Sequence, residues 1–223
     1  MNQNTSNDFL QVLGLFKEHI EDILSQEGNI LVEENVSIPI EETLDKVKKE
    51  INNCQKCKLS HNRTNIVFGV GNEKAKLLII GEAPGYDEDI KGEPFVGKAG
   101  QLLTRMLIAI NMKRSDVYIT NVVKCRPPNN RNPLNEEIST CEPYLLKQLN
   151  IIKPKIILTL GNFAAQTLLH TSTGITKLRG KFYFYHDIKL LPIFHPAAVL
   201  RNSNLRKPVW EDLQLLRDEY QKL

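Results

Sequence analysis

The chain has 223 residues, of which 41% are hydrophobic and 25% are charged, a balance typical of a globular protein. No apolar run approaches ~18 residues, and the first residues lack the basic and apolar regions of a signal peptide, so we expect a cytoplasmic protein without membrane contact. The net charge of +3 is unevenly distributed: residues 1–45 hold ten acidic residues and one basic residue, whereas residues 46–223 hold 28 basic and 16 acidic residues. Such a basic region either keeps the surface soluble or attracts polyanions through a long-range, salt-sensitive field.

An acidic extension precedes the main part of the chain. Residues 8–26 place apolar side chains at helical spacing, which predicts an amphipathic helix. The segment after it reads as extended, and Pro39 argues against a central strand there. A second helix is expected over residues 41–53. We therefore predict a helical extension over residues 1–42 and a separate domain over residues 43–223.

From residue 43 onward, short apolar strands alternate with helices. This alternation is typical of βαβ units and predicts a three-layer α/β/α fold with a mostly parallel central sheet. A hairpin is expected around His186 and Asp187, within the sequence FYFYHDIKLLPIF. The expected strands cover residues 77–81, 116–123, 155–161 and 190–194, and the expected helices cover residues 97–112, 135–150, 161–170 and 208–222.

Polar segments follow three of these strands. The segment at residues 81–100, GEAPGYDEDIKGEPFVGKAG, holds five glycines, two prolines and five acidic residues. NVVKCRPP begins at Asn121 and HPAAVLRN begins at His195, each at the end of an expected strand. Because ligands of such folds bind beyond the carboxyl ends of the strands, we expect the three segments to meet in one crevice.

The cysteine pattern favours a metal centre. The chain has four cysteines, two in a C-x2-C pair and two separated by fifteen residues: Cys54, Cys57, Cys125 and Cys141. A disulfide framework is not expected in a cytoplasmic chain of this size, whereas four thiolates suit zinc or an iron–sulfur cluster, and the spacing does not separate these two. Four unrelated buried cysteines are the alternative. Lys124 and Arg126 flank Cys125, where they could offset thiolate charge or contact phosphate.

The polar segments resemble motifs of the family 4 uracil-DNA glycosylases, which carry a [4Fe-4S] cluster. The resemblance covers residues 43–223 and rests on GEAPG at 81–85, EDIKGEPFVGKAGQLL at 88–103, ITNVVKCRPPNNR at 119–131 and HPAAVLRN at 195–202. It implies an enzyme that flips deoxyuridine out of DNA and hydrolyses its N-glycosidic bond. Uracil is released and an abasic site remains, which initiates base excision repair. The four cysteines are then expected to hold the cluster in a structural role.

The same resemblance implies roles for individual residues. Phe95 matches the aromatic residue that stacks on the flipped base, and Asn121 matches the residue that reads the base edge. His195 matches the histidine that donates to uracil O2 as charge develops on the leaving base. Glu88 matches the acidic position proposed to activate water, and Glu82 is the second choice for this role. The residues expected to line the uracil pocket are Gly81, Glu82, Ala83, Phe95, Asn121 and His195.

Contacts with DNA follow from the same match. Leu200 or Arg201 would fill the gap left by the flipped nucleotide, as wedge residues do in other DNA-binding proteins. Phosphate contacts are expected from basic side chains at Lys124, Arg126, Arg131, Arg201, Arg206 and Lys207. The expected partner is uracil-containing DNA, single- or double-stranded, bound by a monomer, and the acidic extension is a candidate docking element for a protein. Asp87 and Asp89 are interpreted as solvated loop charges.

Three alternatives stay open. A related branch of the family traps itself covalently on DNA, but that branch carries a His- and Arg-rich insertion that the segment CRPPNNRNP lacks. The domain could be a non-enzymatic iron–sulfur module that binds DNA within a larger assembly, although Glu88, Asn121 and His195 argue against lost catalysis. It could also be a zinc protein with a small-molecule hydrolase site, which the iron content of the purified protein would test.

Overall fold

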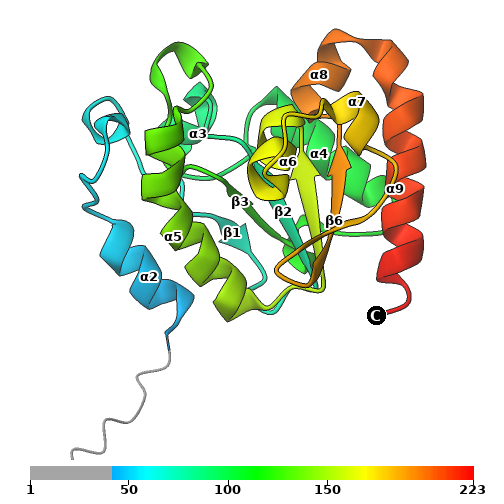
Figure 1. The fold of residues 1–223 in the computed structure, drawn as a ribbon, viewed down its shortest axis with the longest axis horizontal. Helices are drawn as coiled ribbons and strands as arrows, with labels where there is room; N and C mark the ends of the chain where they lie inside the picture. Colours follow the sequence, from blue (N-terminus) through cyan, green and yellow to red (C-terminus); the bar gives the residue numbers. More distant parts are fainter. Residues whose placement is uncertain (1–41) are drawn as a thin grey trace, which may run out of the picture. The chain divides into compact units, whose positions relative to one another are not determined.

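A six-stranded sheet organises the part of the chain that the computed structural model describes, residues 42–223 (Figure 1). The strand order is β1-β3-β2-β4-β6-β5; β3, β2, β4 and β6 run parallel, and the edge strands β1 and β5 pair antiparallel with their neighbours. The strands are β1 (Val70–Gly71), β2 (Leu77–Gly81), β3 (Tyr118–Asn121), β4 (Ile156–Leu160), β5 (Tyr183–Tyr185) and β6 (Ile188–Ile193). The mostly parallel sheet predicted from the sequence is confirmed.

The central strands are apolar because both of their faces are covered. Every residue of β2 and β4 is buried, and the sequences LLIIG and IILTL are the continuous apolar runs expected of such strands. Successive side chains point to opposite faces, so Leu78 belongs to one hydrophobic core and Leu77 to the other. Gly81 pairs with Asn121 in the parallel register, which brings the ends of β2 and β3 level with each other.

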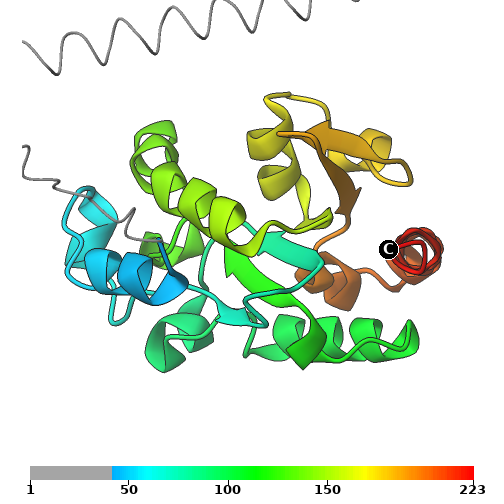
Figure 2. The same cartoon turned by 90° about the horizontal axis from the view of Figure 1, so that it is seen from below.

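Helices cover both faces of the sheet and complete three layers, as Figure 2 shows from below. Leu145 of α5 and Leu168 of α6 belong to the core on one face, and Leu107 of α4, Val199 of α8 and Leu213 of α9 belong to the core on the other. The helices are α2 (Leu44–Ile51), α3 (Tyr86–Lys91), α4 (Lys98–Ala109), α5 (Asn135–Ile152), α6 (Asn162–Leu169), α7 (Ile175–Leu178), α8 (Pro196–Arg201) and α9 (Arg206–Tyr220). The expected three-layer α/β/α architecture is confirmed.

The expected elements after residue 42 are present, with shifts at their ends. The strand expected over residues 116–123 ends at Asn121, because the chain then turns to bring the next residues toward α5, where the Lys124 N–H donates to Cys141 Sγ. The hairpin at His186 and Asp187 is confirmed, since β5 and β6 pair antiparallel and both turn residues have positive φ, 45° and 62°. The sequence did not predict β1, α3, α7 or α8.

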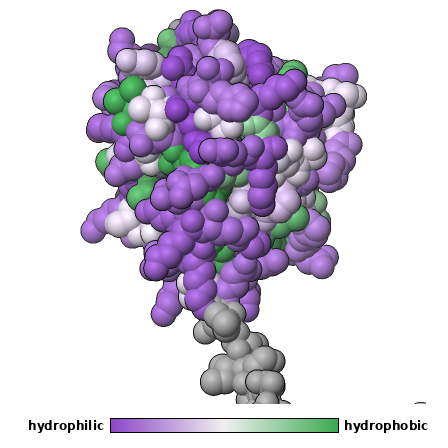
Figure 3. All heavy atoms as spheres, turned by 90° about the vertical axis from the view of Figure 1, so that its left-hand side faces the viewer, coloured by the Kyte–Doolittle hydropathy of each residue, from purple (hydrophilic) through white to green (hydrophobic). Residues whose placement is uncertain are grey.

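The predicted extension, the search for membrane-spanning helices and the surface complete the description. The helix expected over residues 8–26, and the extension with it, lie outside the described residues, so that boundary stays a prediction. No helix within residues 42–223 is long and apolar enough to cross a membrane. The face on which α2 lies is mainly hydrophilic, with small hydrophobic patches (Figure 3).

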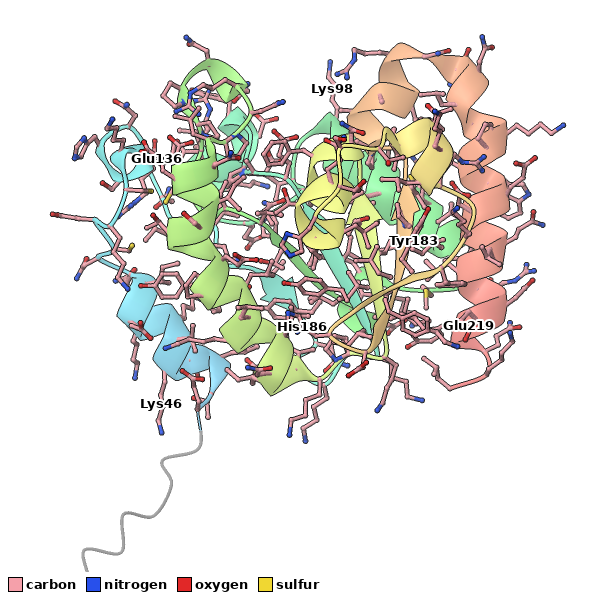
Figure 4. The ribbon with its side chains drawn as sticks, in the orientation of Figure 1. Lys46, Lys98, Glu136, Tyr183, His186 and Glu219 are labelled. Carbon is pink, nitrogen blue, oxygen red and sulfur yellow. The ribbon has the colours of Figure 1, made fainter. Side chains whose placement is uncertain are left out.

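The two ends of the sheet carry different structures. Lys98, which begins α4, and Glu136, in the first turn of α5, lie toward the end where the parallel strands terminate (Figure 4). His186, in the turn between β5 and β6, lies at the opposite end (Figure 4). Helix starts therefore gather at the carboxyl ends of the strands, where α/β folds bind their ligands.

Candidate active site

A cleft with a volume of about 570 Å³ opens where the parallel strands terminate. Glu82 follows β2, Asn121 ends β3, Gly161 follows β4 and His195 follows β6, and all four residues line the cleft. The three polar segments singled out in the sequence therefore meet in one crevice, as predicted. The segment after β4 is a fourth contributor that the sequence analysis did not include.

Asn121 lines this cleft and carries a buried polar atom without a partner among the described residues. The residue is 1% exposed, and its Oδ1 has no hydrogen-bond partner among the described residues. A Cβ atom on Gly81 would lie 2.4 Å from this oxygen and 2.6 Å from the Phe95 ring, so only glycine lets both side chains approach the end of β2 so closely. Because a buried amide oxygen without a partner is costly, the arrangement suits a ligand that donates a hydrogen bond to it.

Phe95 forms an aromatic wall of the cleft. It is 7% exposed, and its ring centroid lies 5.7 Å from that of His195 with 34° between the ring planes. Its φ of 54° is unusual for a residue with a large side chain, so the surrounding structure must hold it. Gly100 is part of that support, since a Cβ atom there would lie 1.7 Å from the Phe95 carbonyl oxygen. The backbone thus fixes where the ring lies.

Glu88 reaches from α3 to the start of α4. Its Oε1 accepts hydrogen bonds from the backbone N–H groups of Val96 and Gly97, at 2.9 and 3.0 Å. Gly97 is the N-cap of α4 and has no side chain with which to cap it, so Glu88 supplies both an acceptor and a negative charge at that end of the helix. Its second oxygen, Oε2, lies beside Gly85 at the cleft.

His195 is held as a neutral hydrogen-bond donor. It is the N-cap of α8, and its Nδ1 accepts a hydrogen bond from the Ala197 N–H at 3.1 Å. Because Nδ1 accepts, a neutral ring carries its proton on Nε2. Burial, together with the charge of Arg201, lowers the pKa of His195 to about 4, and Glu88 acts in the opposite direction. The ring is therefore uncharged at neutral pH.

Glu82 is the second carboxyl group at the cleft. Burial raises the pKa of Glu82 to about 6, so this carboxyl group changes its protonation state close to neutral pH. The backbone around it is tied to the chain after β3, because the N–H groups of Val122 and Val123 donate to the carbonyl oxygens of Gly81 and Glu82, at 2.9 and 3.2 Å. Ala83 also lines the cleft.

Asp89 is buried, and its interpretation as a solvated loop charge was wrong. The side chain is 2% exposed, and its Oδ1 accepts from the N–H groups of Thr64 and Asn65 at 2.9 and 3.2 Å. Asn65 returns a hydrogen bond through Nδ2 to the Asp89 carbonyl oxygen, at 2.8 Å. Asp89 therefore fastens α3 to the segment that follows the C-x2-C pair. Its neighbour Asp87 is exposed, as expected.

Lys124 is fully buried, which contradicts its expected contact with DNA phosphate. Its Nζ donates to the Asn121 carbonyl oxygen at 2.6 Å, and to Thr120 Oγ1 and Gln148 Oε1 at 2.7 Å each. Burial lowers the pKa of Lys124 to about 7, and the thiols of Cys141 and Cys125 oppose this shift. An ammonium group enclosed in this way cannot extend to a phosphate, so the prediction was wrong.

The other predicted DNA-binding residues lie at the surface. Leu200 is 48% exposed at the end of α8, and Arg201 lines the cleft beside it. Arg206 and Lys207, at the start of α9, are exposed. Their contacts with DNA stay predictions.

Two further arginines have protein partners. Arg126 donates to Asn130 Oδ1 at 2.8 Å and lies over the ring of Tyr86. Arg131 makes a two-pronged pair with the buried Glu137, at 2.7 and 2.9 Å. Arg131 lines the cleft, so Glu137 sets the direction of a guanidinium group there. Phosphate contacts from both arginines stay predictions.

The four cysteines lie in one region of the core. Cys125 and Cys141 are buried, and Cys54 and Cys57 pack partly buried against the same hydrophobic cluster. The backbone N–H of Lys124 donates to Cys141 Sγ, and the Arg63 guanidinium donates to Cys125 Sγ, both at 3.4 Å. Burial raises the pKa of the Cys125 thiol to about 12, although Arg63 opposes this shift.

This arrangement bears on which metal group would fit. Within residues 42–223, no three or more His, Cys, Asp or Glu side chains converge closely enough to hold a metal ion. A single zinc ion needs its sulfur ligands at about 2.3 Å, whereas a four-iron cluster spreads its four thiolates farther apart. The N–H and guanidinium donors to sulfur suit either group by stabilising thiolates. The residues are compatible with a cluster.

Sequence reasoning missed several polar residues that support the site. Glu137 and Gln148 are buried on α5. Arg63 donates to a cysteine sulfur and stands directly before the residues whose N–H groups donate to Asp89. A signal for the first two existed, because Glu137, Cys141 and Gln148 recur at helical spacing along the buried side of α5. No pattern in the sequence marks Arg63.

The fold and the cleft define an α/β protein with a cleft beyond its parallel strands, lined by an amide whose Oδ1 has no partner within residues 42–223, an aromatic ring and a neutral histidine. The sequence model described as the Uracil DNA glycosylase superfamily matches residues 68–214, and the chain belongs to this superfamily. A Type-4 uracil-DNA glycosylase of Archaeoglobus fulgidus is 50% identical over 181 residues, which cover 78% of this chain and 91% of the relative.

Two further relatives carry the same description. The Type-4 uracil-DNA glycosylase of Sulfurisphaera tokodaii is 48% identical over 186 residues, which cover 79% of this chain and 84% of the relative. That of Thermotoga maritima is 44% identical over 178 residues, which cover 78% of this chain and 93% of the relative. The chain therefore spans most of the length of each of these relatives.

Proposed function

We propose that this protein is a uracil-DNA glycosylase, which hydrolyses the N-glycosidic bond of deoxyuridine in DNA, releases uracil and leaves an abasic site for base excision repair. Membership of the superfamily and similarity to three Type-4 enzymes support this activity. The observation that carries it is Asn121, which lines a cleft together with Phe95 and His195 and whose buried Oδ1 has no hydrogen-bond partner within residues 42–223.

Asn121 reads the base edge in this proposal. Its amide offers an acceptor to uracil N3–H and donors to uracil O4. Cytosine has the opposite pattern at these positions and would leave the buried amide unpaired, so the amide discriminates strongly between the two bases. Phe95 stacks on the face of the flipped base, a contact worth ~1–3 kcal/mol.

His195 stabilises the leaving base. When the bond between the sugar C1′ and uracil N1 breaks, its electron pair stays with uracil and negative charge develops at O2. The neutral ring donates through Nε2–H to this oxygen, because Nδ1 is occupied as an acceptor of the Ala197 N–H. The low pKa of His195 suits a donor that remains neutral and does not protonate the base fully.

A carboxylate completes the reaction at the sugar. Water attacks C1′ as the sugar becomes cationic, and a nearby carboxylate stabilises that charge and takes the proton of the water. Glu88 is the first choice, because Oε1 is fixed by two backbone N–H groups and Oε2 lies at the cleft. Glu82, which also lines the cleft, is the second choice.

The cysteines would hold a [4Fe-4S] cluster, which contributes a cross-link between distant segments of the chain. Cys54 and Cys57 come from the segment after α2, Cys125 from the segment after β3 and Cys141 from α5. Their shared position in one core and the donors to their sulfurs support this proposal. Iron and sulfide analysis of anaerobically purified protein tests it, and zinc in place of iron would overturn it.

At the DNA, Leu200 enters the gap left by the flipped nucleotide, and Arg201, Arg206 and Lys207 contact phosphates. The exposure of Leu200 and the position of Arg201 at the cleft support this arrangement. A monomeric enzyme and a docking role for the acidic extension stay predictions.

The activity is tested on end-labelled oligonucleotides, single-stranded and duplex, that carry one deoxyuridine. After incubation with the protein, alkali cleaves each abasic site. Scission at the uracil is expected, with none in a thymine control and little with the variants His195→Ala and Asn121→Ala. Lys74→Met, at an exposed position before β2, is the control and should cleave like the parent. Absence of scission by the iron-loaded parent protein would overturn the proposed activity.

A further inference from the structure

Lys124 does not line the cleft, yet polar atoms enclose its ammonium group. Nζ lies 2.6 Å from the Asn121 carbonyl oxygen, 2.7 Å from Thr120 Oγ1 and 2.7 Å from Gln148 Oε1. In its protonated form Lys124 has three N–H donors, and three acceptors surround its Nζ. Distances this short are typical of charge-assisted hydrogen bonds. The geometry therefore assigns each donor of Lys124 one partner.

The acceptors around Lys124 are themselves fixed. Thr120 Oγ1 donates to the Phe68 carbonyl oxygen at 2.9 Å, and Gln148 Nε2 donates to the same oxygen at 2.8 Å. The network joins the end of β3, the C-terminal half of α5 and the segment before β1, and all of its side chains are buried. A buried network with every member paired is rigid, because each group can leave its place only by losing a hydrogen bond.

One member of this network is the backbone of Asn121. Its carbonyl is the last of β3, and Lys124 supplies the donor that this buried group needs. The carbonyl and the side chain share one Cα atom, so holding the carbonyl sets the direction in which the amide enters the cleft. The amide Oδ1 has no hydrogen bond of its own within residues 42–223, so the backbone and the close packing at Gly81 supply this restraint.

The backbone of Lys124 faces the cysteines. Its N–H donates to Cys141 Sγ at 3.4 Å, and Cys125 is the next residue in the chain. The same residue thus contacts the proposed cluster ligands through its main chain and the base-reading residue through its side chain.

We propose that Lys124 is a positioning residue, which holds Asn121 for base recognition and links the placement of Asn121 to the thiols of Cys125 and Cys141. The proposal rests on the proposed function, because it assigns Asn121 to uracil. It replaces the phosphate contact expected for this lysine with a role inside the protein.

The first test is a double-mutant cycle on the full-length, iron-loaded protein. Single-turnover excision of uracil from a single-stranded oligonucleotide is measured for the parent, Lys124→Met, Asn121→Ala and the double variant. Lys124→Met should slow excision roughly tenfold and cause no further loss in the Asn121→Ala background, because Lys124 acts through Asn121. An equal loss in both backgrounds, or no loss at all, would overturn the proposal. A parent protein that does not excise uracil would overturn the proposed function instead.

A second pair of variants, with a smaller change to the hydrogen-bond network, tests the proposal if Lys124→Met does not fold. Thr120→Val keeps the shape of Thr120 but removes one acceptor of the ammonium group, whereas Thr120→Ser keeps the hydroxyl. Excision should slow in Thr120→Val and stay near the parent rate in Thr120→Ser. Equal rates for the two variants would contradict the proposal.

The link to the cysteines has a readout other than activity. Coupling between two sites is reciprocal for binding free energies, so a base in the cleft should reduce the amount of iron that a chelator removes at equilibrium. With free uracil as the probe, this protection is expected in the parent and in the exposed control Lys74→Met, and it should be absent in Lys124→Met. Full protection in Lys124→Met, or none in the parent, would overturn the link.

Discussion

At the scale of single residues, Gly81 is a position where one methyl group should disturb two side chains of the cleft directly. The Cβ atom of Gly81→Ala would lie within 3 Å of both Asn121 Oδ1 and the Phe95 ring, at 2.4 and 2.6 Å, so both side chains must shift. A displacement of about 1 Å at a reacting site can reduce the rate roughly 10²-fold, and we expect a loss of this order in single-turnover excision. Gly174→Ala is the matched control, because its Cβ atom would meet nothing within 4 Å. Parent-like excision by Gly81→Ala would show that the cleft tolerates the shift.

His195 should make folding stability depend on pH. Its pKa is about 4 in the folded protein, against 6.5 for a histidine exposed to water, so the unfolded chain binds the proton first as the pH falls. The contribution of His195 is therefore complete above pH 6.5 and is lost progressively between pH 6.5 and pH 4. By pH 5 the loss amounts to about 2 kcal/mol. Urea unfolding at several pH values should show a shallower decline for His195→Gln than for the parent, and equal slopes would contradict the assignment.

Residues that line the cleft were easier to predict from the sequence than buried residues that hold the lining residues in place. Asn121 and His195 lie in segments that match family motifs near the carboxyl ends of expected strands, and both residues line the cleft. Lys124 could not be assigned in this way, because lysine is usually exposed and its acceptors come from residues 120, 121 and 148. Only the fold brings Gln148 of α5 next to the end of β3.

At the scale of elements, long apolar segments could be predicted from the sequence, whereas short polar segments could not. The strands β2 and β4 are continuous apolar runs, and the sequence predicts both. The α3 sequence, YDEDIK, looks like a charged loop. Its helix is held by hydrogen bonds that Asp89 and Glu88 accept from N–H groups outside α3, and these partners cannot be recognised from the sequence. With only four and two residues, α7 and β1 are too short to show a period.

The start of α4 should depend on Glu88 for stability as well as for catalysis. Glu88→Ala removes the acceptor of the Val96 and Gly97 N–H groups, and we expect it to lower the free energy of unfolding by about 1–2 kcal/mol. Glu88→Gln keeps an oxygen acceptor but loses the charge, so it should unfold near the parent midpoint while excision falls roughly 10²-fold. Thermal unfolding and single-turnover kinetics separate the two effects. Parent-like excision by Glu88→Gln would move the catalytic role to Glu82.

The attachment of α3 should depend on Asp89. Asp89→Ala leaves the N–H groups of Thr64 and Asn65 without their buried carboxylate partner, and a loss of about 2–4 kcal/mol in unfolding free energy is expected. Asp87→Ala, on the exposed side of the same helix, should change the unfolding free energy little. The comparison uses denaturant midpoints for both variants, and similar midpoints would show that Asp89 does not fasten α3.

At the scale of the whole molecule, the uneven charge should govern affinity for DNA. Deleting residues 1–42 removes most of the acidic excess, so the remaining chain should bind DNA more tightly at low salt and show a steeper loss of affinity as salt rises. Uracil excision should persist in the truncated protein. A full-length variant with the acidic residues of 1–42 changed to amides is the control, and it should reproduce the tighter binding. Loss of all activity in a folded truncated protein would contradict this expectation.

The chain order of the strands also bears on the point during synthesis at which the cleft can be completed. Chains emerge N-terminus first, and β2, at the centre of the parallel strands, is made before β3, β4 and β6. Asn121 can therefore take its place beside Gly81 while the segment that carries His195 is still unmade. The cleft is completed only when β6 pairs with β4 and α8 begins at Pro196. On the proposed roles of Asn121 and His195, we therefore expect uracil excision only after β6 and the start of α8 have formed.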